Sequence, residues 1–186
     1  MEQQMASPCW LEPCRRDDMD KVQELLQTKA FSVDASWTGH PLSLAGFSGN
    51  ATPLGIAIGH HSAKVVRLLL HSGAPVNEVC ASYSTGEDQA YTPLGWALWI
   101  SVRLSNGGQL VDILTNLLLY GASPSVPLVH NGKQITPKQF ALAEGVGKSR
   151  EWAEALKLSS CVKWCRNACV AILGLRKVSN VLQKVR

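Results

Sequence analysis

The 186-residue chain lacks the long apolar run that a membrane-spanning helix requires. No segment approaches the ~20 consecutive apolar residues that cross a bilayer. The first apolar cluster is short, and the N-terminus carries acids and glutamines, unlike a secretion signal. We therefore expect a soluble chain. Its length and its hydrophobic content of 46% suffice for a sizeable core, which predicts one domain or one array.

The sequence also lacks the residue patterns of common catalytic and cofactor sites. Paired carboxylates, a nucleophile elbow and zinc-ligand spacing are all missing. Residues 145–149 end in Gly-Lys-Ser, as a phosphate-binding loop does, but the first glycine of that loop is replaced by Leu142. His60 and His61 are adjacent, so on a helix they point about 100° apart and make poor co-ligands. We expect no enzyme activity, no cofactor and no metal site.

None of the six cysteines belongs to a Cys-x-x-Cys pair. Cys161, Cys165 and Cys169 lie four residues apart, so on a helix they share one face and cannot comfortably pair with each other. We expect all six to be free thiols in a reducing compartment. This predicts a cytoplasmic location, with the nucleus or a host-cell cytosol as alternatives. The triplet is typical of an apolar packing stripe; metal binding and palmitoylation are the alternatives.

Two stretches of the chain are near copies of each other. Thr52–Ala57 reads Thr-Pro-Leu-Gly-Ile-Ala, and Thr92–Ala97 reads Thr-Pro-Leu-Gly-Trp-Ala. An apolar segment that ends in leucines and Gly-Ala follows each of them, at 68–74 and at 117–122. Recurrence at this period of roughly 33–45 residues indicates a stacked repeat protein, in which each unit buries its apolar face against its neighbours.

The residue types in these motifs suit helix starts and ends. The hydroxyls of Thr52 and Thr92 can cap a helix, and the proline that follows each one fits the first helical position. Apolar residues then recur at helical spacing over 65–70 and 113–118, which predicts a second amphipathic helix in each unit. Gly73 and Gly121 can end these helices in the left-handed conformation.

This arrangement resembles the ankyrin repeat, and a third match begins at Thr136-Pro137. A worn half-match precedes them, with Val22 and Leu25 in the positions of a second helix. The resemblance covers about residues 15–158 and implies an all-α solenoid of three to four helix-turn-helix repeats with long loops. We expect an N-terminal segment at 1–14 and a C-terminal basic amphipathic helical extension at 159–186.

The spacing departs from a plain ankyrin repeat in two places. The connections before Thr52 and Thr92 are long, and Pro41-Leu42 echoes the helix-start motif, which suggests a short extra helix there. The interval from Ala97 to Leu117 is 20 residues, whereas the interval from Ala57 to Leu69 is 12. Either the first helix of the third unit is longer or a loop protrudes.

The ankyrin resemblance implies that a protein partner binds the loop tips and the exposed positions of the first helices. By register, Trp99 points outward, and tryptophans dominate interface hot spots. The alternative is that a longer helix packs Trp99 against its own neighbours. The candidate partner-binding residues are Trp37, His40, His60, Tyr83, Glu87, Asp88, Trp99, Ile100, Asn131, Lys133 and Glu144.

Positive charge gathers at the C-terminal end. Residues 155–186 carry seven Lys or Arg and no acid, so with a net charge of +4 the remainder is mildly acidic at −3. The apolar residues of this segment favour a helical cap on the last repeat. Docking of a ubiquitin-ligase scaffold and weak membrane association are alternatives. The segment shows no recognisable nucleic-acid motif, so we expect no specific nucleic-acid partner.

Together these patterns predict a non-catalytic adaptor or inhibitor that binds a protein partner of unstated identity. A peripheral lipid-associated protein, a ubiquitin-ligase substrate receptor and a bacterial effector delivered into host cells are the alternatives.

Overall fold

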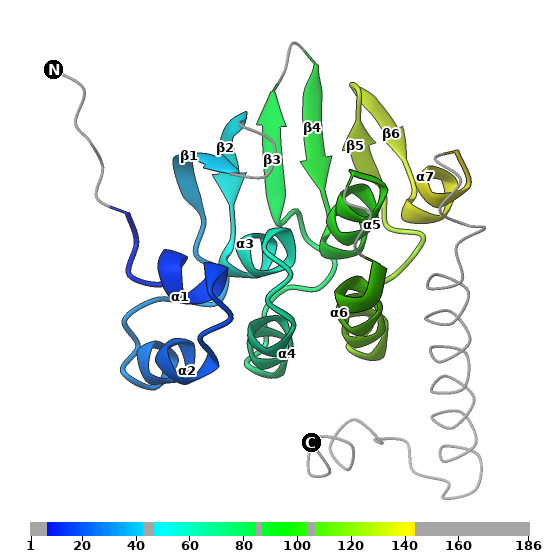
Figure 1. Cartoon of the computed structure of the whole chain (residues 1–186). Helices are drawn as coiled ribbons and strands as arrows, with labels where there is room; N and C mark the ends of the chain where they lie inside the picture. Colours follow the sequence, from blue (N-terminus) through cyan, green and yellow to red (C-terminus); the bar gives the residue numbers. More distant parts are fainter. Residues whose placement is uncertain (1–6, 43–46, 85–86, 104–106, 144–186) are drawn as a thin grey trace, which may run out of the picture.

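The structure is a computed structural model that describes residues 7–42, 47–84, 87–103 and 107–143. Within them, β-hairpins alternate with pairs of helices to build three layers (Figure 1). A sheet forms one layer, the first helix of each pair forms the middle layer, and the second helices form the outer layer. The predicted C-terminal extension at 159–186, with its cysteine triplet, lies outside the described residues.

The first helices stack on one another, and so do the second helices. The first helices are α1 (Leu11–Arg15), α3 (Pro53–Gly59), α5 (Pro93–Arg103) and α7 (Pro137–Ala143). The second helices are α2 (Met19–Gln27), α4 (Ala63–His71) and α6 (Gly107–Leu119). This stacking of helix pairs follows the predicted repeat units. Helical structure begins at Leu11, before the predicted boundary at residue 15.

The expectation of an all-α fold is wrong, because the structure contains a six-stranded antiparallel sheet. Its strands are β1 (Trp37–Leu42), β2 (Phe47–Ala51), β3 (Ala81–Ser84), β4 (Asp88–Tyr91), β5 (Leu128–His130) and β6 (Lys133–Ile135). They pair in chain order. The stretches expected to be long loops are extended hairpins, and neighbouring hairpins satisfy one another's backbone N–H and C=O groups.

The short extra helix suggested at Pro41-Leu42 is also wrong. Both residues belong to β1, where Pro41 pairs with Ser48 and Leu42 pairs with Phe47. β1 is an edge strand of the sheet, and an edge strand tolerates proline, which has no N–H to donate. The edge position therefore overrides the helix-start echo in the sequence.

The predicted helix signals are confirmed. The hydroxyl oxygens of Thr52, Thr92 and Thr136 accept hydrogen bonds from backbone N–H groups three residues on, at 3.1, 3.4 and 3.2 Å. Gly73 and Gly121 follow α4 and α6 with φ of 90° and 95°, the left-handed geometry that glycine allows.

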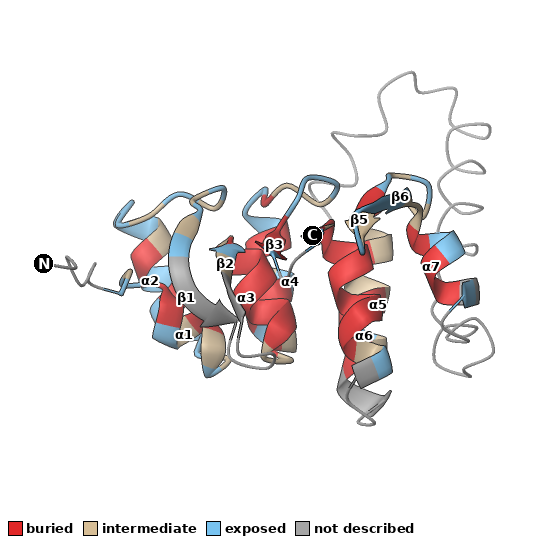
Figure 2. Cartoon of the chain, turned by 90° about the horizontal axis from the view of Figure 1, so that it is seen from above, coloured by how far each residue is buried: buried red, intermediate tan, exposed pale blue. Residues whose placement is uncertain are grey.

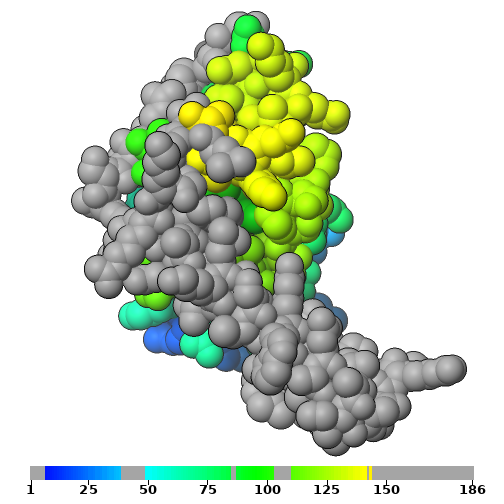
Figure 3. All heavy atoms as spheres, turned by 90° about the vertical axis from the view of Figure 1, so that its right-hand side faces the viewer, coloured from blue at the N-terminus to red at the C-terminus, as the bar shows by residue number. Residues whose placement is uncertain are grey.

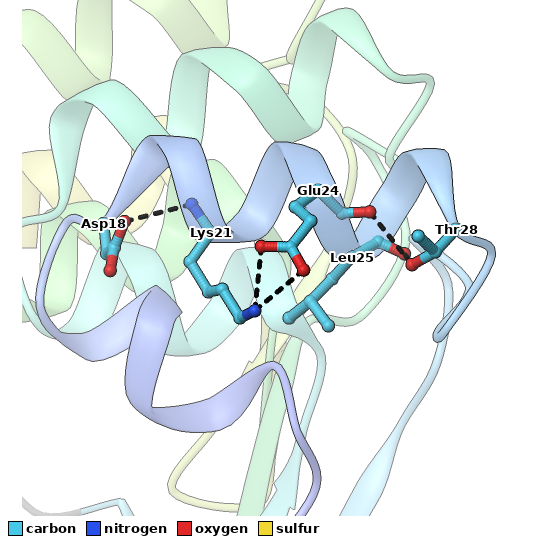
Figure 4. A network of polar contacts seen from close by, with 5 residues as sticks. All are labelled: Asp18, Lys21, Glu24, Leu25 and Thr28. Atoms are coloured by element: carbon cyan, nitrogen blue, oxygen red, sulfur yellow. Dashed lines mark hydrogen bonds and ion pairs between the residues drawn. The ribbon is translucent and has the colours of Figure 1, made fainter.

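The first unit, α1 and α2, is held partly by local polar contacts (Figure 4). The Asp18 carboxylate caps α2 by accepting from the Lys21 N–H at 3.0 Å. The Lys21 ammonium pairs with Glu24 at 2.8 Å, and the Thr28 hydroxyl donates to the Glu24 carbonyl at 2.9 Å. Only Val22 and Leu25 of α2 are buried. This exposed helix thus depends on capping and charge as well as on packing.

The extra length of the third unit goes into helix. α5 has 11 residues where α3 has 7, and α6 has 13 where α4 has 9. Burial is heaviest on α3 and α5, at the centre of the stack (Figure 2). Among the described residues, no helix is long and apolar enough to cross a membrane.

Candidate protein-binding surface

The structure contradicts the outward placement of Trp99 and Ile100. Trp99 is 6% exposed and Ile100 is 1% exposed, so neither offers a side chain to a partner. α5 continues to Arg103, and the β3–β4 hairpin lies over its first turns. The longer helix packs Trp99 inward, which is the alternative that the 20-residue spacing left open.

Four aromatic rings fill the angle between the β3–β4 hairpin and α5. The rings of Trp96 and Trp99 stack with centroids 5.0 Å apart and an interplanar angle of 9°. Tyr83 of β3 meets both indoles edge-on, and Tyr91 of β4 lies 5.5 Å from Trp96 and 6.0 Å from Trp99. Such arrangements are worth about 0.5–1.5 kcal/mol per pair beyond burial. In this unit the chain's own side chains occupy the space beside the first helix.

The neighbouring helix α3 is shaped to receive Trp96. The indole N–H of Trp96 donates to the Gly55 carbonyl at 3.0 Å. A Cβ on Gly59 would lie 3.5 Å from the same indole nitrogen, so the ring is in contact with that bare backbone position. The glycines Gly55 and Gly59 of α3 therefore pack against the Trp96 indole of α5, and this contact joins the second and third units.

The other predicted residues differ in exposure. Glu87, Asp88, Asn131 and Lys133 are exposed at the ends of the second and third hairpins. Trp37 is half-buried against the core, His60 is half-buried at the end of α3, and Tyr83 is 8% exposed. His40 lies in β1, where its backbone pairs with Gly49. Glu144 lies outside the described residues.

Hydrogen bonds join the tips of the second hairpin (β3–β4) and the third hairpin (β5–β6). The Gly132 N–H donates to the Asp88 carbonyl at 3.1 Å. The Gln89 side chain, 5% exposed, bridges to Asn131 twice: its amide donates to Asn131 Oδ1 at 2.9 Å, and its Oε1 accepts from the Asn131 N–H at 3.1 Å. We call these three hydrogen bonds the clasp. They unite two loops that are 42 residues apart in the sequence.

Tyr91 and His130 extend the hydrogen-bond network of the clasp toward the core. Gln89 Oε1 carries no proton, so the Tyr91 hydroxyl donates to it across 2.9 Å. The same hydroxyl lies 2.6 Å from His130 Nδ1, and having used its only proton it accepts from that nitrogen. The ring of His130 also packs edge-on against Phe140 of α7, with centroids 5.1 Å apart. The clasp is thus tied to the aromatic core and to the last described helix.

Six exposed residues surround the clasp and form what we call the tip surface. They are Ser84, Glu87, Asp88, Asn131, Gly132 and Lys133. Between described residues, ion pairs are found in α1 and α2, and none involves the tip surface. In Figure 3, which looks onto the α7 side, the yellow-green to yellow atoms of about residues 120–143 lie at the surface. The tip surface offers charged and amide groups on a fixed backbone.

Gln89 and Tyr91, which support this surface from the buried side, were not predicted from the sequence. A signal was present at Asn131-Gly132, because Asn-Gly is a strongly preferred pair for a two-residue hairpin turn. Both residues have positive φ, 50° and 66°, as the two central positions of such a turn require. Recognising that hairpin would have predicted strands in the preceding connection as well.

The described cysteines do not form a reactive or metal-binding group. Cys9, Cys14 and Cys80 are free thiols. Burial, with a smaller contribution from Cys9, raises the pKa of Cys14 to about 12, and burial also raises the pKa of Cys80. Thiols with such values remain protonated near neutral pH and are poor nucleophiles. Among the described residues, no cluster of His, Cys, Asp and Glu could hold a metal ion.

The comparison with known families agrees with the repeat geometry. The family model for the ankyrin repeat matches residues 49–81, from β2 through α3 and α4 to the first residue of β3. The chain therefore contains an ankyrin repeat at residues 49–81. No curated protein matches it. Ankyrin repeats are typically non-catalytic interaction domains that bind protein partners, and this repeat includes helix α3, whose Gly55 carbonyl accepts from the Trp96 indole.

Proposed function

We propose that this ankyrin-repeat protein is a non-catalytic adaptor or inhibitor that binds its protein partner through the tip surface. The clasp carries the proposal. Because three hydrogen bonds already hold the two tips in one arrangement, a partner that binds them orders little additional backbone. The aromatic rings beside α5 have no exposed face of comparable size to offer, since Trp96, Trp99, Tyr83 and Tyr91 are all buried.

The charges of the tip surface support recognition of a polar partner. Glu87, Asp88 and Lys133 expose charges of both signs at the ends of two hairpins that the Gly132–Asp88 backbone hydrogen bond joins. Exposed charges on opposing surfaces favour specificity and the rate of encounter more than affinity. The proposed partner therefore presents both signs of charge to the ends of these hairpins.

Affinity capture with charge-swapped variants tests this proposal. The full chain is used as bait in cytosolic extract and compared with Glu87→Lys/Lys133→Glu. A matched control, Arg67→Glu/Asp112→Lys, swaps exposed charges on α4 and α6 with the same net charge. We expect the wild type and the control to retain the same partner and the tip variant to lose it. A partner retained by the tip variant and lost by the control would place binding on the outer helices instead.

We further propose a cytosolic location, which the free thiols of Cys9, Cys14 and Cys80 support. A fluorescent fusion of the full chain should distribute through the cytosol. Accumulation in a secretory compartment would contradict this.

A further inference from the structure

The Asn131-Gly132 turn joins a chemically labile dipeptide to the clasp. We propose that Asn131 is a deamidation site whose reaction is held back by the clasp and proceeds when the clasp opens. The inference concerns the covalent chemistry of the chain itself. Its consequence for partner binding rests on the proposed function, but the reaction does not.

The reaction joins two groups of adjacent residues, and the fold restrains both of them by hydrogen bonds. The nucleophile is the Gly132 backbone nitrogen, and the electrophile is the Asn131 side-chain carbon Cγ. Glycine has no side chain to hinder the approach, and Asn131 is exposed to water. In the folded chain the Gly132 N–H is held by the Asp88 carbonyl at 3.1 Å, and Asn131 Oδ1 is held by Gln89 at 2.9 Å.

The chemistry is complete with water as the only co-reactant. The Gly132 nitrogen loses its proton to solvent and bonds to Asn131 Cγ, the bond from Cγ to Nδ2 breaks, and ammonia leaves with a proton. The resulting five-membered succinimide ring adds one water molecule. Opening at one carbonyl gives aspartate, and opening at the other gives isoaspartate, in which the main chain runs through the side-chain carbon.

The two products differ in their effect on the clasp. Aspartate keeps an oxygen that can accept from Gln89, and Asp-Gly suits the same turn as Asn-Gly. Isoaspartate lengthens the main chain within a two-residue turn, so it cannot keep both the Gly132–Asp88 and the Asn131–Gln89 hydrogen bonds. Conversion to isoaspartate would separate the second hairpin from the third and alter the tip surface irreversibly.

Peptide mass mapping during prolonged incubation at neutral to mildly alkaline pH tests the proposal. The full chain is followed in its native state and in denaturant. Asn77 and Asn116, which glycine does not follow, serve as slow internal controls, and Asn106, which precedes Gly107, serves as the reference Asn-Gly pair. In denaturant Asn131 should react like Asn106. In the native chain we expect its rate to fall at least about tenfold, equivalent to ~1.4 kcal/mol for opening the clasp.

Two variants assign that protection to the clasp. Gln89→Met removes every side-chain hydrogen bond of Gln89, and Gln89→Glu keeps the acceptor for Tyr91 and for the Asn131 N–H but removes the donor to Asn131 Oδ1. We expect both to accelerate deamidation in the native chain, Gln89→Met more than Gln89→Glu. If Gln89→Met does not melt cooperatively, Gln89→Glu carries the test.

Three results would overturn the proposal. The first is a native rate equal to the denatured rate, because the fold would then give no protection. The second is an unchanged rate in a folded Gln89 variant, because the clasp would then not be the restraint. The third is an absence of reaction at Asn131 in denaturant while Asn106 reacts. None of these results depends on a partner, so each is separable from failure of the proposed function.

Discussion

Helices α3 and α5 begin with nearly the same six-residue motif, yet they make different contacts with the neighbouring repeats. Both start with Thr-Pro-Leu-Gly and place an alanine at the sixth position, and both are capped by the threonine hydroxyl. They diverge at the fifth position, which is Ile56 in α3 and Trp96 in α5, and again at the eighth, which is Gly59 in α3 and Trp99 in α5.

The two divergent positions are complementary rather than independent. Trp96 reaches from α5 onto α3, where Gly55 supplies a carbonyl to the indole and the ring packs over the backbone at Gly59. Trp99 then stacks on Trp96 and fills the space between α5 and the β3–β4 hairpin. The shared motif thus determines how each helix starts, and the divergent positions determine how neighbouring repeats interlock.

The largest expected effect comes from truncating Trp96, the α5 side chain that packs on α3. Trp96→Ala should lower the free energy of unfolding by about 3–5 kcal/mol, since it removes a 1%-exposed indole and three ring contacts. At the equivalent position of α3, Ile56→Val removes a single methyl group and should cost only about 0.5–1.5 kcal/mol. Urea denaturation of both variants measures this difference. Equal losses would mean that the two helices are energetically interchangeable.

The next effect separates the two equivalent motif glycines. A Cβ on Gly55 would lie 2.1 Å from the Cys80 carbonyl oxygen, a backbone atom that also accepts from the Thr52 N–H. On Gly95 it would lie 2.4 Å from Leu128 Cδ2, the end of a side chain that can rotate away. Gly55→Ala should therefore destabilise by about 3 kcal/mol and Gly95→Ala by about 1 kcal/mol, measured by thermal melts. A larger loss for Gly95→Ala than for Gly55→Ala would show that the backbone at Cys80 moves aside more easily than the Leu128 side chain.

Gly59→Ala should have the opposite sign from Gly55→Ala within the same helix. The added methyl would meet Trp96 at 3.5 Å, an ordinary contact, while alanine favours helix over glycine by up to about 1 kcal/mol. Stability should be unchanged or slightly raised in a urea titration. A loss comparable to that of Gly55→Ala would mean that Trp96 is seated more tightly on α3 than the contact distance indicates.

The smallest effect concerns His61, in the turn between α3 and α4. His61 has a φ of 59°, and burial lowers its pKa below the ordinary value of 6.5. The unfolded chain therefore binds a proton here before the folded chain does, so His61 contributes stability above about pH 6.5 that is lost as the pH falls. Asparagine also tolerates this backbone geometry. His61→Asn should flatten the pH dependence of stability between about pH 7 and 5, and an unchanged profile would assign that dependence to other groups.

The sequence predicted the helical half of the fold well because its signals are local. A threonine cap, a proline at the first helical position and a terminal glycine each act within one or two turns. They correctly located the starts of α3, α5 and α7 and the ends of α4 and α6. The second helix of the first unit was found because Val22, Leu25 and Leu26 resemble the second helices of the other repeats.

The sheet and the position of Trp99 could not be predicted in the same way, because both depend on neighbouring units. The hairpins become strands by pairing with hairpins about 40 residues away, and Gln89 acquires its role only when Asn131 lies beside it. The direction of Trp99 is decided by whether α5 stops after two turns, as α3 does, or continues to Arg103. Glu87, Asp88, Asn131 and Lys133 lie at the ends of the second and third hairpins, and their role in partner binding stays a prediction.

Hydrogen exchange of the Trp96 indole N–H, followed by proton–nitrogen correlation NMR and assigned with Trp96→Phe, tests the interlocking of α3 and α5 most directly. The chain in denaturant provides the unprotected reference rate. We predict that the Trp96 signal persists in deuterated solvent until the whole chain unfolds, since its proton is bound to the Gly55 carbonyl and its ring is buried. Exchange as rapid as that of the denatured chain would show that water reaches the space between the hairpin and α5, and would contradict the proposed packing of Trp96 on α3.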